Sequence, residues 1–279
     1  MKNVILALCV IFIPFMAYAE TTYDRVLRTG VIKCGYMLWP PYFDMDLTTK
    51  KFSGMNYEYV EALGRNLGLK IDWVMEVNLG DQVEALRTGK IDAICGSEGP
   101  VMPSTTKFLT YSIPMIYVPF YLYSRADDKR FETDARTIIN HDNIRISVID
   151  GDVSGQAARV LFPQAKTVAI PQLGTPTQMM MDVASKKADI VINEPLSMGE
   201  YSKYNPNILK KIDGNRPAVI VPNTLSFLRS NDTLTFINIM NQAIDNLKNS
   251  GEEDVILAPY LKTPAGENSF YRTSQPYAR

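Results

Sequence analysis

The chain has 279 residues, of which 46% are hydrophobic and 21% charged, and its formal net charge is −1. Because charges of both signs are interspersed, the surface suits neither nucleic acid nor an anionic membrane. The sequence has no HExxH, CxxC or P-loop spacing, and its one histidine, His141, lies in the polar segment Asn140–Asn143. We therefore expect no metal, no cofactor and no Ser-His or Cys-His nucleophile.

The N-terminal residues 1–19 have the pattern of a signal peptide. Lys2 supplies the positive start, Val4–Met16 is apolar, and Ala17–Ala19 is a small-x-small cleavage site. The apolar run is shorter than the roughly 20 residues of a membrane span, and no other stretch approaches that length. We expect an exported, soluble mature chain, whose net charge changes from −1 to −2 when Lys2 is removed. A lipoprotein anchor at Cys9 is the alternative, although Leu8 precedes it where a small residue is expected.

The mature chain, about 260 residues, exceeds the size at which one hydrophobic core usually keeps growing, so we expect two lobes. Apolar periodicity and Gly or Pro stop signals predict the elements of the first part. They are strands at Val31–Tyr36, Leu69–Val74 and Ile91–Cys95, a Pro-rich turn at Trp39–Pro41, and helices at Met55–Leu67, which Gly68 ends, and Asp81–Arg87. This β-α-β-α-β order is typical of a mostly parallel sheet covered by helices.

The pattern then partly repeats. We predict strands at Ile144–Ile149, Thr167–Ile170 and Ile190–Asn193, and helices at Ser154–Phe162 and from Thr175 to about Lys187. In addition, Lys90–Cys95 (KIDAIC) is similar to Lys187–Ile192 (KADIVI), and both segments follow a predicted helix. Two like α/β lobes would produce such an internal similarity.

Two strand-like runs connect the predicted lobes. The aromatic run Tyr117–Tyr123 leads from the first lobe to the second, and Ala218–Val221, continuing through Ser226–Arg229, leads back. Two crossings make the first lobe discontinuous, so we expect residues 20–117 and 223–279 in lobe 1 and residues 118–222 in lobe 2. A helix at Thr233–Asn249 would pack back on lobe 1, and the polar segment after Leu261 should be loosely held.

Five short motifs, in order along the chain, carry a resemblance to a known family. In Ile91–Pro114, Asp92 opens a strand, Gly96-Ser97 form a turn, and Tyr111–Pro114 stands for a Phe-Ser-x-Pro element. The other motifs are Pro40–Phe43 after the first strand, Gly54–Glu58 before a helix, Asp150–Ser154 before a second-lobe helix, and Ala188–Glu194 at a strand end. From about Val31 to Leu261 this layout resembles the extracytoplasmic solute-binding receptors of family 3, which serve ABC importers.

The resemblance implies a two-lobe α/β fold of the periplasmic-binding-protein type 2 class, with a ligand cleft between the lobes. It also implies a periplasmic, monomeric receptor that closes by hinge motion around a small polar ligand, an amino acid or a related amine. The implied protein partner is the membrane permease of an ABC transporter. In the family, the strands that hold Cys34 and Cys95 are neighbours, so the resemblance also allows a disulfide, with buried free thiols as the alternative.

The implied ligand site lies at strand ends and helix N-termini of both lobes. Glu194 stands where the family carries an Asp for the ligand's amine, although a surface or capping acid is the alternative, and Asp152 has the competing role of a helix cap. Core packing is the alternative for the aromatic residues, and a solvated loop acid for Glu98. The expected ligand-binding residues are Tyr36, Trp39, Tyr42, Gly96, Ser97, Glu98, Thr105, Asp152, Ser154 and Glu194.

One residue of the family pattern is missing. The family clamps the ligand's α-carboxylate with an Arg, but no Arg lies between Gly96 and Pro114, and Lys107 is too close to Tyr111 to take its place. With acids expected at both sides of the cleft, we predict a ligand that is cationic or lacks a carboxylate. A carboxylate held by backbone N–H groups and the hydroxyls of residues 104–106 is the alternative, and it should bind less tightly.

Two other function classes fit the same fold. Some dehydratases of prephenate-like substrates share it and use a second-lobe acid, which would make Glu194 a general acid. Such substrates carry two carboxylates, and the missing Arg disfavours them, so we do not expect an enzyme. A receptor-like domain without a small-molecule ligand is the remaining alternative.

Overall fold

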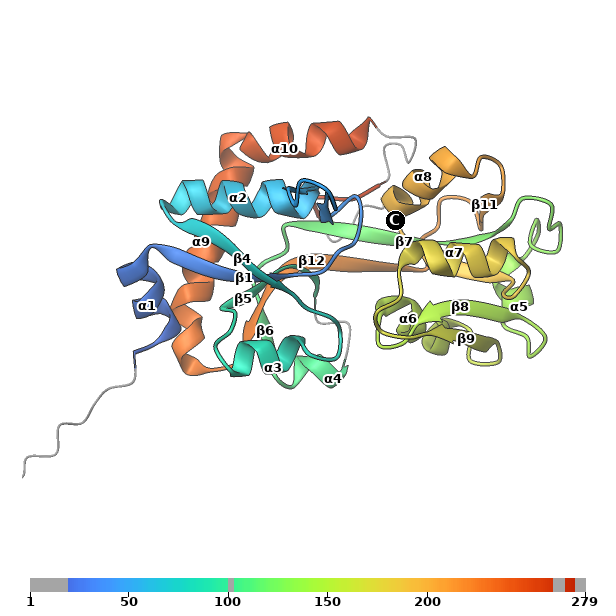
Figure 1. Cartoon of the computed structure of the whole chain (residues 1–279). Helices are drawn as coiled ribbons and strands as arrows, with labels where there is room; N and C mark the ends of the chain where they lie inside the picture. Colours follow the sequence, from blue (N-terminus) through green and yellow to red (C-terminus); the bar gives the residue numbers. More distant parts are fainter. Residues whose placement is uncertain (1–19, 100–102, 263–268, 274–279) are drawn as a thin grey trace, which may run out of the picture.

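The computed structural model describes residues 20–99, 103–262 and 269–273, and the predicted signal peptide lies outside these ranges (Figure 1). Within them, no helix combines the length and apolar character needed to cross a membrane. The strands form one mixed sheet that extends through two lobes, joined by two long strands, and a separate two-stranded hairpin. The predicted two-lobe α/β architecture is confirmed.

Each lobe is built in the same order. In the first lobe, β1 pairs in parallel with β4 and β5, and β5 then pairs in the antiparallel sense with β12, which also holds β6. In the second lobe, β8 pairs in parallel with β9 and β10, and β10 pairs in the antiparallel sense with β7, which also holds β11. The strands are β1 (Val31–Tyr36), β4 (Lys70–Glu76), β5 (Ala93–Glu98), β6 (Leu109–Tyr111), β7 (Ile116–Arg125), β8 (Arg145–Ile149), β9 (Lys166–Ile170), β10 (Ile190–Asn193), β11 (Leu209–Ile212) and β12 (Val219–Leu228).

The sequence similarity between the lobes has a structural counterpart at the start of the third strand of each. The Asp92 carboxylate accepts the backbone N–H of Lys33 at 2.7 Å, and the Asp189 carboxylate accepts that of Arg145 at 2.9 Å. In return, the backbone N–H of each Asp donates to the carbonyl of the same partner at 2.8 Å. The two acids therefore have the same structural role, because each fixes the register between the first and third strands of its lobe.

The long strands β7 and β12 connect the lobes, as Figure 1 shows. They pair with each other from Ile116–Asn223 to Phe120–Val219, and each then continues into a lobe. The predicted lobe boundaries, after residues 117 and 222, fall inside this paired stretch. Relative rotation of the lobes would therefore bend these two strands.

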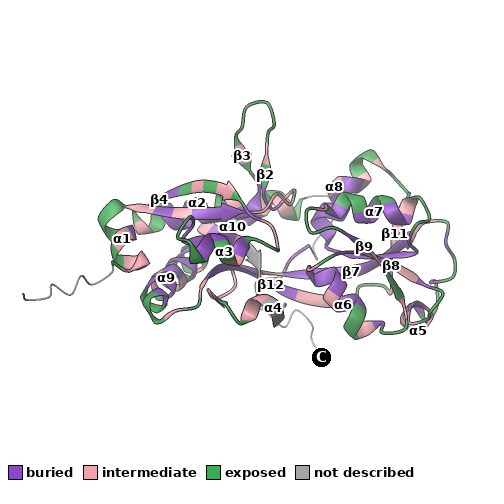
Figure 2. Cartoon of the chain, turned by 60° about the horizontal axis from the view of Figure 1, so that its bottom comes forward, coloured by how far each residue is buried: buried purple, intermediate pink, exposed green. Residues whose placement is uncertain are grey.

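Helices cover the sheet in both lobes. The amphipathic helix α2 and the long helix α9 pack on each other beside the first-lobe sheet, and α6 and α7 contact β8 and β10 in the second lobe. The hairpin β2–β3 projects from the first lobe with exposed residues along its length (Figure 2). The bounds are α1 (Thr22–Thr29), β2 (Asp44–Met45), β3 (Phe52–Ser53), α2 (Met55–Leu67), α3 (Gln82–Arg87), α4 (Pro103–Thr106), α5 (Ala135–Ile139), α6 (Val153–Leu161), α7 (Pro176–Ala184), α8 (Pro195–Tyr204), η1 (Asn231–Thr233), α9 (Leu234–Ser250) and α10 (Glu252–Leu261).

The two cysteines within the described residues form a disulfide. Cys34 in β1 and Cys95 in β5 are bonded to each other, with their Cα atoms 5.6 Å apart. Both residues are buried in the first-lobe core. Of the two alternatives left open by the sequence, the structure has the bridge and not the free thiols.

The described part of the C-terminal segment is not loosely held, so that expectation is wrong for residues 269–273. Tyr271 and Tyr117 exchange two backbone hydrogen bonds of 2.7 Å each, which attaches the segment to the start of β7. Phe270 is buried in the core, and Arg272 pairs with Glu253 and Asp254 of α10. The sequence did not indicate this attachment, because the segment as a whole is polar.

Candidate ligand-binding site

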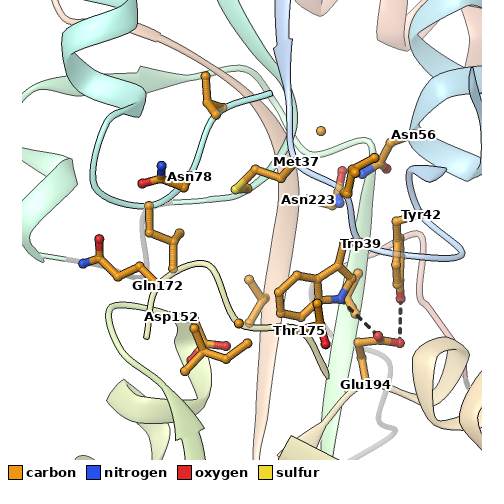
Figure 3. Close-up of a pocket in the computed structure, with 18 of the residues that line it drawn as sticks. Met37, Trp39, Tyr42, Asn56, Asn78, Asp152, Gln172, Thr175, Glu194 and Asn223 are labelled. Carbon is orange, nitrogen blue, oxygen red and sulfur yellow. Dashed lines mark hydrogen bonds between the residues drawn. The ribbon is translucent and has the colours of Figure 1, made fainter. Parts of the chain in front are cut away.

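A cavity of about 230 Å³ lies between the lobes (Figure 3). Its lining comes from the ends of β1, β4 and β5 in the first lobe, from β7 and β12, and from the loops that follow β8, β9 and β10 in the second lobe. The charged residues of the lining are Glu76, Asp152 and Glu194, and no Lys, Arg or His belongs to it among the described residues. Most of the remaining surface is apolar, so the cavity combines negative charge with hydrophobic walls.

The turn after β1 forms the first-lobe wall because it lies on the N-terminus of α2. The backbone N–H of Met55 donates to the carbonyl of Pro41 at 3.1 Å, and that of Asn56 donates to the carbonyl of Tyr42 at 2.7 Å. These are the N–H groups that a helix leaves unpaired at its start. Gly54 permits the contact, because its φ is +114° and an added Cβ would lie 2.6 Å from the Tyr42 carbonyl oxygen. The turn thus presents the side chains of Trp39 and Tyr42 to the cavity.

Glu194 joins the two lobes. Its carboxylate caps α8 by accepting the Ser197 N–H at 2.9 Å, and it also accepts the Trp39 indole N–H and the Tyr42 hydroxyl, each at 3.3 Å (Figure 3). The Ser197 hydroxyl donates to the Pro40 carbonyl at 2.8 Å, again across the lobes. Burial raises the pKa of Glu194, although its hydrogen bonds from Ser197 and Trp39 oppose the shift. Both carboxylate oxygens of Glu194 are therefore occupied by protein donors.

Asp152 caps α6 with only one of its oxygens. Its Oδ1 accepts the backbone N–H groups of Ser154 and Gly155 at 2.8 and 3.2 Å and the Ser154 hydroxyl at 2.5 Å. Its Oδ2 is buried and has no hydrogen-bond partner among the described residues. Burial raises the pKa of Asp152 to about 6. The capping role considered from the sequence is present, and the residue lines the cavity as well.

The structure brings together five of the predicted site residues in the lining: Trp39, Tyr42, Gly96, Asp152 and Glu194. Ser154 is not part of the lining, but its hydroxyl donates a hydrogen bond to the Asp152 carboxylate. Tyr36 and Thr105 do not line the cavity, and the Tyr36 ring stacks on Phe43 with centroids 4.9 Å apart. The side chains of Ser97 and Glu98 lie outside the described residues, so their predicted roles stay untested.

The sequence reasoning missed several polar residues of the lining, among them Asn78, Gln172 and Asn223. Asn78 and Gln172 follow β4 and β9, which occupy equivalent places in the two lobes. Their loops approach across the cavity, since a Cβ on Gly80 would lie 2.5 Å from the Gln172 side-chain oxygen. The rule that ligands of α/β lobes bind at strand carboxyl ends was the signal available for these two residues.

Three solved structures with the same fold are distant from this chain in sequence. An ancestral amino-acid-binding protein, described as a precursor of cyclohexadienyl dehydratase, is 20% identical with a TM-score of 0.72 and covers 87% of this chain and 100% of its own. A binding component of an ABC transporter from Wolinella succinogenes, complexed with lysine, is 18% identical with a TM-score of 0.71, and the match covers 82% of this chain and 95% of that one. The periplasmic VFT2 domain of Bordetella pertussis BvgS is 19% identical with a TM-score of 0.70, with 85% and 96% covered.

No curated protein matches the chain by sequence. A family model does match, over residues 32–263, and this span includes both lobes and every described residue of the cavity lining. The matched span also contains all five sequence motifs. The chain belongs to the bacterial extracellular solute-binding proteins, family 3.

Proposed function

We propose that this protein is a periplasmic receptor for a small organic cation that lacks a carboxylate. The observation that carries the proposal is the charge of the cavity lining, which holds Glu76, Asp152 and Glu194 but no basic residue among the described residues. A carboxylate placed there would meet acids and no cationic partner. Loss of a charged partner in a buried site typically costs about 2–5 kcal/mol.

The size and walls of the cavity support the same ligand class. Its volume of about 230 Å³ lies below the roughly 300–1,000 Å³ of drug-sized ligand pockets, so a small molecule fits best. Its aliphatic walls suit a carbon chain, and the indole of Trp39 suits a cation, which gains about 0.5–2 kcal/mol over a desolvated ring. The Wolinella succinogenes structure holds lysine in the same fold, a ligand with a cationic side chain but also with a carboxylate.

The proposed mechanism is hinge closure. Ligand contacts made by both lobes favour the closed form, because only that form offers all of them at once. Strands β7 and β12 would be the hinge, and the closed monomer would deliver its ligand to the membrane permease of an ABC importer. Trp39, Tyr42 and Gly96 would contribute the first-lobe side of the site, and Asp152 and Glu194 the second-lobe side.

A dehydratase on this fold is the second candidate, because Glu194 is a buried acid with a raised pKa, as general acids often are. We favour the receptor for two reasons. A prephenate-like substrate with two carboxylates would face three acids in the lining. In addition, Glu194 is already engaged by donors from both lobes, and proton transfer would require it to leave them.

Titration calorimetry of ligand-stripped protein with two matched pairs of compounds tests the proposal. Agmatine is arginine without its carboxylate, and cadaverine is lysine without its carboxylate. We expect at least one of these amines to bind about 30-fold or more tightly than its parent amino acid, since about 2 kcal/mol corresponds to that ratio. Equal or tighter binding of arginine or lysine would contradict the proposal, and so would binding of neutral or acidic amino acids alone.

A further inference from the structure

We propose that Asp152 is the residue that pairs with the cationic group of the ligand. Glu194 instead links the closed lobes by accepting hydrogen bonds from the first lobe. This inference rests on the proposed function, since it assigns the roles of the two buried acids in the same cavity. It also reverses the assignment that the sequence suggested, in which Glu194 met the amine. The two acids differ in which of their carboxylate oxygens already have donors.

Both oxygens of Glu194 already accept hydrogen bonds from the protein. Its Oε1 accepts the Trp39 indole N–H at 3.3 Å, and its Oε2 accepts both the Ser197 N–H at 2.9 Å and the Tyr42 hydroxyl at 3.3 Å. Two of these donors come from the first lobe, and the third fixes the start of α8. An ammonium group that bound Glu194 would compete with the donors that hold the lobes together.

Asp152 has the opposite arrangement. All of its local donors converge on Oδ1, whereas Oδ2 is buried without a partner in the described part of the chain. The side chain is 2% exposed and lines the cavity. A buried charged oxygen without a partner is among the most costly features of a protein interior, and an ammonium or guanidinium group from a ligand would supply the missing donor.

No cationic side chain hydrogen-bonds to Asp152 among the described residues. Arg159 lies on the helix that Asp152 caps, and its charge favours the ionised carboxylate, but its guanidinium donates to Gln156 at 3.2 Å and not to Asp152. The other charged residues that face the cavity, Glu76 and Glu194, are acids. A second acceptor on the cavity wall, the side-chain oxygen of Asn223, is also buried and has no partner within the described ranges. Unpaired acceptors suit a ligand rich in N–H donors, as ammonium and guanidinium groups are.

The test compares D152N, E194Q and D142N with wild type in calorimetric titrations with agmatine at pH 7.5. Asn retains the Oδ1 acceptor that caps α6 but removes the charge. We expect D152N to lose at least about 30-fold in affinity, and E194Q to lose less. D142N removes an equal charge from an exposed turn, with the Asp142 side chain 84% exposed, and should retain wild-type affinity. Thermal unfolding of each variant establishes that it is folded.

A pH series supplies a second readout that a merely structural role would not alter. Wild type and E194Q should lose agmatine affinity between pH 7.5 and pH 5, because Asp152 takes up a proton in that range, whereas D152N should show a much smaller change. Agmatine affinity of D152N within threefold of wild type would overturn the inference and leave the proposed function intact, as would an equal loss in E194Q. Failure of wild type to bind any of the amines would overturn both.

Discussion

Removal of the Cys34–Cys95 disulfide, in the variant C34A/C95A, should lower the free energy of unfolding by about 2–4 kcal/mol. The bond joins residues 61 positions apart and closes a loop that contains α2, β4 and α3, which is much of the first lobe. Without it, the unfolded chain gains the conformational freedom of that loop. Both sulfur atoms are also buried, so their loss leaves space in the first-lobe core and adds to the cost.

Urea unfolding of the variant and of wild type, both free of ligand, measures this effect. Wild type unfolded in the presence of a reducing agent is the control, and its stability should fall toward that of the variant. A difference below about 1 kcal/mol between oxidised wild type and the variant would show that the bond does not constrain the unfolded chain as described.

The second large effect concerns the cost of the buried charge on Asp152. Burial raises its pKa from 3.8 to about 6, so between these values the folded state holds a proton that the unfolded state has lost. Stability therefore falls as the pH rises through this window, and the full cost is present above about pH 6. The raised pKa corresponds to a loss of at most about 3 kcal/mol in the free energy of unfolding, at about 1.36 kcal/mol for each pKa unit.

D152N should accordingly be more stable than ligand-free wild type, by about 1–3 kcal/mol at pH 7.5, with a difference close to zero at pH 4. The comparison isolates Asp152, because Glu194 and the other acids titrate in both proteins. Urea unfolding at the two pH values measures it. A variant that is less stable than wild type at pH 7.5 would mean that the Asp152 charge is stabilised by the protein itself, and would remove the reason to expect a cationic ligand there.

The fold was largely predictable because its strongest signals are local. The helix Met55–Leu67 and the strands Val31–Tyr36 and Ile190–Asn193 have the predicted bounds, since their apolar periods are regular and Gly68 ends the helix. The helices α1 and α10 were not predicted. The helix α1 is short and mostly polar, with only Val26 buried, whereas α10 contains Pro259 and has no amphipathic pattern.

The candidate site was predictable in position but not in detail. Asp152 and Glu194 follow strands, and the carboxyl ends of strands in α/β lobes are where ligands bind, so both acids could be found from sequence. The direction of Tyr36 could not, because it depends on Phe43 and Phe52 folding over its ring. Nor could the difference between the acids, because two of the three donors to Glu194, Trp39 and Tyr42, lie more than 150 positions earlier in the chain.

Native mass spectrometry of the protein purified without unfolding tests the central claim most directly. Each closed receptor molecule that retains its natural ligand should show a bound mass, and release under denaturing conditions followed by fragmentation identifies the compound. We predict a small amine or guanidine with no carboxyl group. A co-purified amino acid or another carboxylic acid in the cavity would contradict the account.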